Sequence, residues 1–346
     1  MKVIEARNPH EALIKGIYEL RQFGIPRSSR NGPVLVMPTP VTTIYNFPLE
    51  RVIFWPQRDA NPFFHLYESL WMLAGRNRVE PLVRYAKNMA NYADNGIIHG
   101  AYGYRWRYDF GMDQLQLIIK RLQDDPDDRR CVLQIWDAKR DLNQNFKDLP
   151  CNTIVSFQRD IEGNLDMTVF CRSNDIIWGA YGANAVHFSM LQEYIARSIG
   201  CQMGRYYQVS VNWHAYTGVL DKLIGLTEIT NVGLYSIPTP IENPYKAGVI
   251  PTPMPDYSSG RLDRLIRDLL YNADEGFPTF PDPIEDIHAW GKVVYKVLRA
   301  HHIYKVSGDA SKAIDYLADY VEHKFDWVIA ATQWLERRQK KHENTK

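Results

Sequence analysis

Apolar residues recur along this chain at two spacings, and each spacing predicts a different kind of element. A spacing of three or four residues, typical of one helical face, occurs in residues 10–23, 62–73, 113–123 and 184–199. Asn61 followed by Pro62 is a typical helix start, and Gly75 and Gly200 are natural stops. Shorter runs, apolar or alternating in polarity, predict strands at residues 131–137, 152–158, 164–171 and 207–212.

Two of the predicted strands are joined by a turn signal, Gly163-Asn164. A short turn of this kind between two apolar runs predicts a β-hairpin. Strands and helices are interspersed along the chain without an internal repeat. We therefore expect an α+β fold built on one large mixed sheet.

The C-terminal part of the chain has a different pattern. Residues 237–257 are rich in proline and predict a linker or an extended edge. Helical spacing then returns at residues 262–269, 284–306 and 310–335. We expect a main domain at residues 1–257 and a helical C-terminal extension at residues 258–346 packed on it, with a solvated, fraying tail at residues 337–341.

Composition narrows the class of protein. The chain has 346 residues, with 45% hydrophobic and 23% charged content, as in globular proteins. A net charge of +1 gives no electrostatic reason to expect nucleic acid as a partner. Its 4 cysteines form no close pair, which argues against a metal site or a disulfide framework and fits a reducing cytoplasm. With no signal-peptide core and no apolar run of membrane-spanning length, we expect a cytoplasmic protein without a membrane partner.

Cys151 is the candidate nucleophile. It follows Pro150 at the start of one strand of the hairpin, and Arg172 ends the other strand, so folding brings both to the same end of the sheet. A thiol beside a cation ionises more readily, and arginine is permanently charged. The alternative is that Cys151 is a small buried apolar residue, the usual state of a lone cysteine.

Three other residues stand where proton transfer or hydroxyl binding is expected. Glu68 lies in the very apolar helix at 62–73. If buried, it would have a raised pKa and could transfer protons; a solvent-facing glutamate is the alternative. His214 and Tyr216 are two apart at the end of a strand, so they share a face and could together hold a sugar hydroxyl.

Arginines at two places could bind a phosphate group. Arg30 lies in a polar loop with serines and a glycine, and the pair Arg129-Arg130 precedes an apolar strand. Guanidinium groups match phosphate oxygens in geometry and charge. The alternatives are a solvated loop and neutralisation of the neighbouring aspartates.

Together and in order, several short motifs resemble those of the thymidylate synthase and pyrimidine-nucleotide hydroxymethylase superfamily. They are Glu68–Trp71, Ala101–Arg107, Asp127–Arg130, Pro150–Cys151, Arg172–Asp175 with Gly179, and His214–Tyr216. The resemblance implies a thymidylate synthase-like mixed sheet flanked by helices. It also implies a pyrimidine nucleoside monophosphate and a reduced folate as partners, and no metal.

The resemblance assigns a role to each matching residue. In the chemistry, Cys151 would add to C6 of the pyrimidine, Glu68 would manage protons through water, and Tyr102 would assist removal of the C5 proton. The binding residues would be Arg30, Arg172, Ser173 and a partner subunit's Arg129 and Arg130 on the 5′-phosphate, His214 and Tyr216 on the 3′-hydroxyl, and Asp175, Met89 and Gly179 on the folate side. Arginines supplied by a partner subunit imply an obligate homodimer.

By this resemblance, thiolate addition lets C5 attack the methylene carbon of 5,10-methylenetetrahydrofolate and leaves an exocyclic methylene. Hydride then gives a methyl product, and water gives a hydroxymethyl product.

Several departures of this sequence from the synthase pattern favour the reaction with water. Met89 stands where a folate-stacking tryptophan is usual, and Asn152 replaces the usual histidine after the nucleophile. Asp148, which we place among the catalytic residues, and Asn174 resemble hydroxymethylases. The helical extension replaces the short apolar tail of synthases.

The residue that reads the base has two candidates. Synthases read uracil four residues after the glycine that matches Gly179; that position is Ala183, and Asn184 follows. If Ala183 faces the base, the chain resembles CMP hydroxymethylases. If the loop carries one extra residue, Asn184 reads uracil or cytosine. We expect CMP or dCMP as substrate; the alternatives are a dUMP hydroxymethylase, a thymidylate synthase, and a non-catalytic nucleotide- or RNA-binding homologue.

Overall fold

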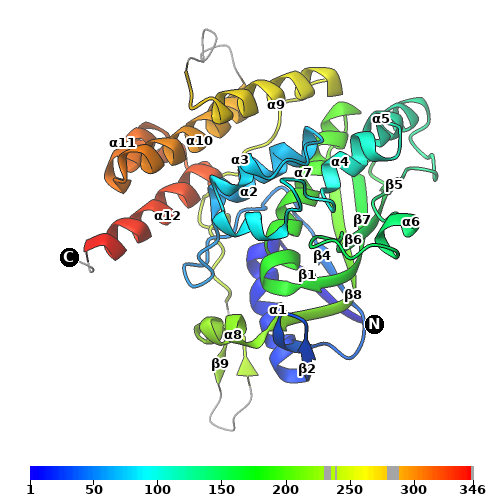
Figure 1. Cartoon of the computed structure of the whole chain (residues 1–346), viewed down its shortest axis with the longest axis horizontal. Coiled ribbons are helices and arrows are strands. Elements are labelled where there is room, and N and C mark those ends of the chain that lie inside the picture. Colours follow the sequence, from blue (N-terminus) through cyan, green and yellow to red (C-terminus); the bar gives the residue numbers. More distant parts are fainter. Residues whose placement is uncertain (230–234, 238–239, 279–287, 344–346) are drawn as a thin grey trace.

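The computed structural model describes residues 1–229, 235–237, 240–278 and 288–343. Its centre is an eight-stranded sheet (Figure 1). Six of the strands follow the order β1-β4-β8-β7-β6-β5, and the other two form the β2–β3 hairpin, in which β3 pairs with β8. The strands are β1 (Lys2–Ala6), β2 (Ile25–Ser29), β3 (Gly32–Val36), β4 (Val41–Tyr45), β5 (Val132–Gln134), β6 (Asn152–Arg159), β7 (Leu165–Asp175) and β8 (Met203–Tyr216). A separate small sheet pairs β9 (Glu228–Ile229) with β10 (Tyr235–Ser236).

The sheet is mixed, as predicted. β1 pairs with β4 and β7 with β8 in parallel, and the other neighbours are antiparallel. The hairpin of β6 and β7 is confirmed, with Gly163 at a φ of 83° in its turn, a conformation that favours glycine. β8 is longer than predicted and carries His214 and Tyr216 within the strand.

Helices cover one face of this sheet. In chain order the helices up to α8, apart from the short α4 given below, are α1 (Pro9–Phe23), α2 (Pro62–Leu73), α3 (Glu80–Val83), α5 (Gln114–Asp124), α6 (Ala138–Asp141), α7 (Ala183–Ser198) and α8 (Thr217–Leu220). α1 and α7 contact the strands directly, and α2 lies on α7. α2 begins as predicted, with the Asn61 side chain accepting the backbone N–H of Phe64 at 3.1 Å.

On the opposite face of the sheet, apolar side chains are exposed in the part of the chain that the structure describes. Phe170 of β7 and Val211 of β8 are 41% and 61% exposed, and Val132 of β5 is 43% exposed. Their strand neighbours Cys171 and Leu133 are buried, because successive residues of a strand point to opposite faces. This face therefore presents exposed apolar side chains that a second protein surface could cover.

Short helical turns follow α3 and carry part of the candidate site. These are η1 (Lys87–Tyr92), α4 (Tyr102–Tyr104) and η2 (Arg105–Asp109); the further turns η3 (Ile176–Ala180) and η4 (Asp221–Leu226) follow β7 and α8. Arg105 is fully buried and its Nη atoms bind the carboxylate of Asp141 at 2.6 and 2.8 Å. This buried pair holds the turn that carries Tyr102.

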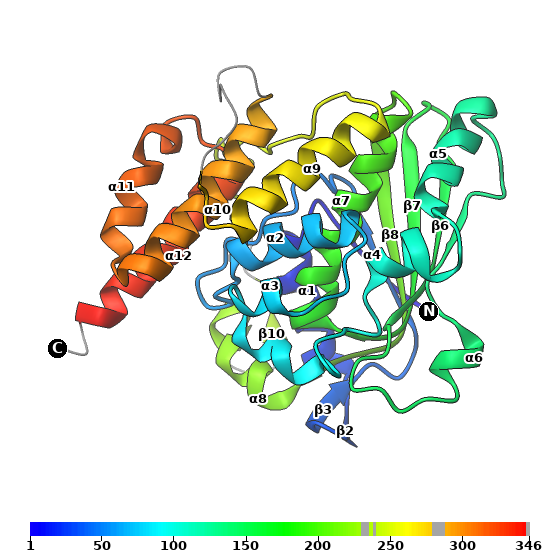
Figure 2. The same cartoon turned by 45° about the horizontal axis from the view of Figure 1, so that its top comes forward.

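The C-terminal helices form an annex on the outer side of α2 (Figure 2). They are α9 (Ser259–Asp274), α10 (Ala289–Ser307), α11 (Ala310–Val321) and α12 (Asp326–Glu343). α9 contacts α2 and α7, and α10 and α12 contact α2. The annex thus packs on the helical layer. None of the helices among the described residues is long and apolar enough to cross a membrane.

Two sequence expectations for the annex are wrong. The span 310–335 is two helices, α11 and α12, because the chain turns at Lys324, whose φ is 54°. Residues 337–341 are no fraying tail: Arg337 and Arg338 bind the carboxylate of Asp59 at 3.0 and 2.8 Å. For the helix expected at 284–306, the part before Ala289 includes residues 284–287, which lie outside the described residues.

Glu193 of α7 forms a buried ion pair with Arg51 and a hydrogen bond with the segment before α9. Glu193 of α7 binds Arg51 Nη1 at 2.7 Å, and their side chains are 0% and 1% exposed. The other carboxylate oxygen of Glu193 accepts the backbone N–H of Met254 at 2.7 Å. The proline-rich segment at 237–257 is thus attached to the core where its residues are described.

Glu193→Gln should destabilise the protein by about 3–5 kcal/mol, because it leaves the Arg51 charge buried without a counter-charge. Urea unfolding of the variant and the wild type measures this difference. Glu322→Gln, at an exposed site after α11, is the matched control and should change the free energy of unfolding by less than about 0.5 kcal/mol. An equally small effect of Glu193→Gln would contradict this account of the ion pair.

Candidate active site

Half of the predicted site residues line two adjoining hollows that share Tyr92. The first, about 210 Å³, is lined by polar Glu68, Asp148, Asn184 and His187, by Tyr92, Tyr102, Gly100, Ala101 and Ala183, and by apolar Trp71, Met72, Met89 and Ile98. The second, about 460 Å³, is lined by Arg30, Asn31, Asn91, Tyr92, Lys147, Trp178 and Tyr216. The first suits a flat ring, and the second offers cations and hydroxyls.

Cys151 lies immediately before β6 and is half-buried. Arg172 is beside it, as predicted: its Nε donates to Pro150 O at 2.9 Å and its Nη2 to Leu149 O at 3.2 Å. Burial raises the pKa of the Cys151 thiol, and the Arg172 charge lowers it by less. Arg172 and burial therefore act on the pKa of this thiol in opposite directions, and activation of Cys151 by Arg172 stays a prediction.

Asp148 and Tyr102 flank the nucleophile. Burial raises the pKa of Asp148 to about 6, although its Oδ2 accepts the backbone N–H of Gly100 at 3.1 Å. Burial also raises the pKa of Tyr102 well above its usual value, and the charges of Cys151 and Asp148 add to this effect. Tyr102 is therefore an O–H donor near neutral pH, while Asp148 can hold or release a proton.

Glu68 is buried, which rules out the solvent-facing alternative. Its Oε2 lies 3.1 Å from Nε2 of His187, a buried residue of α7 that also lines the first hollow. Sequence reasoning did not identify His187. The available signal was its spacing of three residues from Asn184, which puts both on one face of a helix.

Both candidate base-reading residues, Ala183 and Asn184, line the first hollow. The amide of Asn184 is oriented by a buried network. Asn174 Nδ2 donates to Gln208 Oε1 at 2.9 Å and to Ser210 Oγ at 3.0 Å, so its Oδ1 is left to accept Asn184 Nδ2 at 3.2 Å. The Oδ1 of Asn184 and its second N–H have no protein partner among the described residues and are open to a ligand.

Gly179 was predicted on the folate side, and the structure shows a packing reason for it. A Cβ atom at this position would lie 2.5 Å from Asn174 Oδ1 and 2.9 Å from Asn184 Nδ2. Only glycine leaves these two side chains room to meet. Gly179 thus supports the orientation of Asn184 directly.

Asp175 and Met89, the other residues predicted on the folate side, lie at the end of β7 and in the first hollow. Asp175 Oδ1 accepts the backbone N–H groups of Ile177 and Trp178 at 2.8 and 2.7 Å. Its Oδ2 is buried without a partner among the described residues, and burial raises its pKa. An unpaired buried carboxylate oxygen is an open acceptor for a ligand N–H.

The second hollow gathers the residues predicted for the sugar and phosphate. Arg30 and Tyr216 line it, and Asn31 Nδ2 lies 3.4 Å from the Tyr216 hydroxyl. His214 Nδ1 is buried without a partner among the described residues. Ser173, on β7, pairs with Asn212 of β8 beside them. Sequence reasoning missed the other five lining residues, namely Asn31, Asn91, Tyr92, Lys147 and Trp178.

Arg129 and Arg130 are not at this site in a single chain. They precede β5, whose Val132 pairs with Ser156, whereas Cys151 precedes the opposite end of β6. Arg130 Nη2 binds Asp128 at 2.8 Å and is mostly exposed. Their predicted role from a partner subunit stays a prediction.

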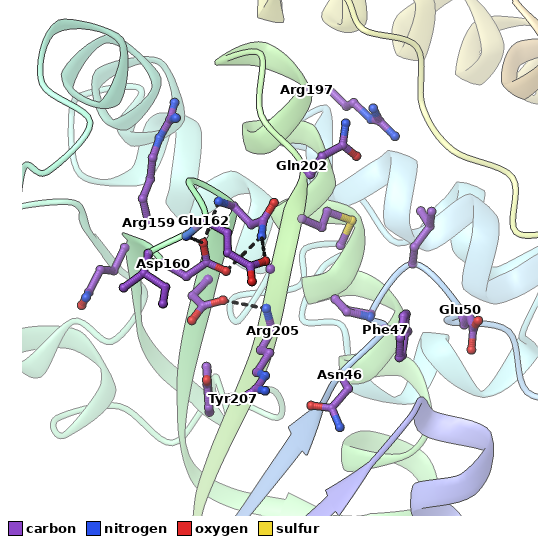
Figure 3. A pocket seen from close by; sticks show the side chains of 18 of the residues that line it. Asn46, Phe47, Glu50, Arg159, Asp160, Glu162, Arg197, Gln202, Arg205 and Tyr207 are labelled. Atoms are coloured by element: carbon purple, nitrogen blue, oxygen red, sulfur yellow. Dashed lines mark hydrogen bonds between the residues drawn. The ribbon is translucent and has the colours of Figure 1, made fainter.

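A larger hollow, about 760 Å³, lies at the β6–β7 turn and the start of β8 (Figure 3). None of the predicted site residues lines it. Its acidic groups are occupied locally, with Asp160 accepting the backbone N–H of Asn164 at 2.8 Å and Asp166 that of Arg205 at 2.6 Å. The size of a hollow alone therefore does not mark the candidate site, which we place where the predicted residues lie.

Across the part of the chain that the structure describes, no three His, Cys, Asp or Glu side chains gather as a metal site would require.

Residues 56–232 match the family model described as thymidylate synthase. The chain belongs to the thymidylate synthase family. This membership confirms the resemblance seen in the motifs.

Named relatives refine the placement. The chain is 46% identical, over 98% of its length and 95% of the relative's, to a deoxyuridylate hydroxymethyltransferase of Pseudomonas phage M6. It is 34% identical, over 66% of its length and 63% of the relative's, to a protein of the same name from Bacillus phage SP01. A putative thymidylate synthase of Methanothermobacter marburgensis is 33% identical over 40% of this chain and 59% of its own. The family's hydroxymethylase branch, predicted from sequence, is thus supported.

Asp148→Asn should stabilise the protein relative to the wild type as the pH rises. Because the pKa of Asp148 is raised to about 6, its neutral form is favoured by folding, and that stability is lost as pH rises from about 4 through 6. The stability difference between variant and wild type should therefore grow over this range. Urea unfolding at about pH 4 and about pH 7 measures it.

The exposed Asp319→Asn on α11 is the control for this measurement and should show no such growth. A constant difference for Asp148→Asn across the range would contradict burial as the cause.

Proposed function

We propose that this protein is a hydroxymethyltransferase that acts on dUMP with 5,10-methylenetetrahydrofolate as co-substrate. The observation that carries the proposal is the 46% identity, over nearly the whole of both chains, to a protein named deoxyuridylate hydroxymethyltransferase. The geometry agrees with it, since a half-buried cysteine adjoins a base-sized polar hollow and a cationic second hollow.

Uracil is favoured over the cytosine expected from the sequence. Three of the relatives are named for deoxyuridylate. Asn184 supports the same choice, because its free Oδ1 and N–H can accept uracil N3–H and donate to O4. Ala183 also lines the hollow and offers no polar atom. Asn184 is then the base-reading residue.

The residues present fit a reduced folate. The unpartnered Oδ2 of Asp175 suits the N–H donors of a pterin, and Met89 and Trp71 supply apolar surface. When bound, the folate supplies the one-carbon unit. The chain's own part is to present Cys151 to C6, to hold the base against Asn184, and to move protons at Glu68, Tyr102 and Asp148.

Water is favoured over hydride for the final step. The first hollow is lined by Glu68, Asp148 and His187, which can hold water. No described residue of the annex lines either hollow, so α9–α12 do not act as a lid there. A hollow with polar groups that can bind water, and with no annex residue in its described lining, favours a hydroxymethyl product.

Incubation with dUMP and methylenetetrahydrofolate in ¹⁸O water should give 5-hydroxymethyl-dUMP with ¹⁸O in its new hydroxyl, as read by mass spectrometry. Cys151→Ala should abolish turnover and still bind dUMP, because the phosphate and base contacts remain. A methyl product, formed with dihydrofolate, would show a thymidylate synthase instead.

Asn184→Asp should shift preference from dUMP towards dCMP, because a carboxylate accepts the cytosine amino group and cannot donate to uracil O4. Loss of that donor should cost dUMP about 1–3 kcal/mol in kcat/KM. Ala183→Ser is the neighbouring control and should leave the preference unchanged. An unchanged preference in Asn184→Asp, with a change in Ala183→Ser, would assign base reading to residue 183.

A homodimer belongs to the same proposal. The sheet face with exposed apolar side chains supports it, as do Arg129 and Arg130, which lie outside the site of their own chain. A partner copy docked on that face could bring these two arginines to the 5′-phosphate.

Mixing inactive Cys151→Ala with an inactive Arg129→Ala/Arg130→Ala variant should restore about a quarter of wild-type activity, because half the dimers then contain one intact site. Each variant refolded alone, which should stay inactive, is the control. Absence of any recovery after subunit exchange would mean that both arginines act within their own chain or not at all.

A further inference from the structure

Glu68 and His187 meet in the base hollow from different helices. Glu68 is on α2 and His187 on α7, and their side chains are 9% and 2% exposed. Glu68 Oε2 and His187 Nε2 are 3.1 Å apart, but Nε2 has no aligned hydrogen-bond partner among the described residues. Catalytic hydrogen bonds are often poorly aligned before a ligand binds. A carboxylate and an imidazole are thus within proton-transfer distance at the site.

The surroundings of this pair distinguish it from ordinary core packing. His65, one turn before Glu68 on α2, is also buried, and its ring centre lies 6.4 Å from that of His187. Burial holds the pKa of His65 well below its usual value, so His65 is neutral. Only His187 of the two lines the hollow. The chain therefore provides one histidine at the site and a buried neighbour that serves as its control.

The proposed reaction needs a base at this place. Water that adds to the exocyclic methylene of the pyrimidine forms a C–O bond and must lose one proton. The electron pair of the methylene double bond moves onto the ring, and it then expels the Cys151 thiolate from C6 and restores the C5–C6 double bond. The proton needs an acceptor beside the hollow.

We propose that His187 is a proton-relay residue for water addition: the Glu68–His187 pair accepts the proton that the attacking water loses. The inference rests on the proposed hydroxymethyltransferase function. Glu68 is the group that faces the water, and His187 shares the proton. The pair then releases the proton to solvent, from which the expelled Cys151 thiolate takes one up, so both Glu68 and Cys151 are ready for the next turnover. Steps before the methylene forms do not need His187.

The first experiment separates early from late steps. With [5-³H]dUMP, tritium release reports loss of the C5 proton, and product formation reports water addition. In His187→Gln, which keeps a side-chain N–H but cannot relay a proton, tritium release should continue at the wild-type rate while product formation falls roughly 10²–10⁴-fold. The accumulated methylene should be captured by added 2-mercaptoethanol as a thioether, detected by mass. Equal rates of tritium release and product formation in His187→Gln would overturn the proposal.

The matched control is His65→Gln, a similar substitution in the same helical layer. It should leave the ratio of product formation to tritium release at the wild-type value and give no thioether. If both variants change the ratio alike, the effect comes from packing of α2 on α7, and the relay is rejected.

A second measurement needs no turnover. In protein labelled with ¹⁵N-histidine, Glu68→Gln should shift the His187 ring nitrogen resonances, because it removes the carboxylate that shares the proton. The His65 resonances should not move. Unshifted His187 resonances would overturn the pairing even if His187→Gln failed to fold. If the wild type gives a methyl product while His187 still responds to Glu68→Gln, the proposed function fails and the pairing does not.

Discussion

The parallel pairing of β7 with β8 is the constraint on which the site depends. It places Asp175 opposite His214 and Cys171 opposite Ser210. Asn174 can then reach Gln208 and Ser210, and through them the direction of the Asn184 amide is defined. Buried amides require partners, so a slip of register would leave several polar groups unpaired at about 1–3 kcal/mol each.

The site combines satisfied and unsatisfied polar groups. The amides of Asn174 and Gln208 are fully used within the protein, which makes their geometry rigid. In contrast, Asp175 Oδ2 and His214 Nδ1 are buried and lack partners among the described residues. Such groups are costly in the unliganded protein, and a ligand that satisfies them regains that free energy on binding. The rigid network thus orients Asn184, and in the proposed function the open groups would supply affinity for the ligand.

Much of the fold and the site could be predicted from the sequence. Alternation of polarity located β6 and β7, and short motifs located Cys151, Glu68 and the residues around them, because these signals are local. The position of His187 could not be found this way, since α7 is buried almost all round and no apolar stripe marks the face towards the site. Nor could the bond between Asp59 and Arg338, which are far apart in sequence and meet only through tertiary packing. The pKa of Cys151 depends on burial, which no neighbouring residue type reveals.

The β2–β3 hairpin connects Arg30, which is predicted to bind the phosphate, with His214 and Tyr216, which are predicted to bind the sugar. β2 is exposed along its whole length, and β3 attaches the hairpin to the sheet by pairing Val34 with Tyr216 and Val36 with His214. Arg30 lies between these two strands, at the hairpin's tip. The hairpin is thus attached to the sheet at the end of β8 that carries His214 and Tyr216, the residues predicted to bind the sugar. A phosphate bound by Arg30 would therefore also hold His214 and Tyr216 in position. A nucleoside without a phosphate would lose the interaction with Arg30 and, in addition, the ordering of the residues predicted to contact its sugar.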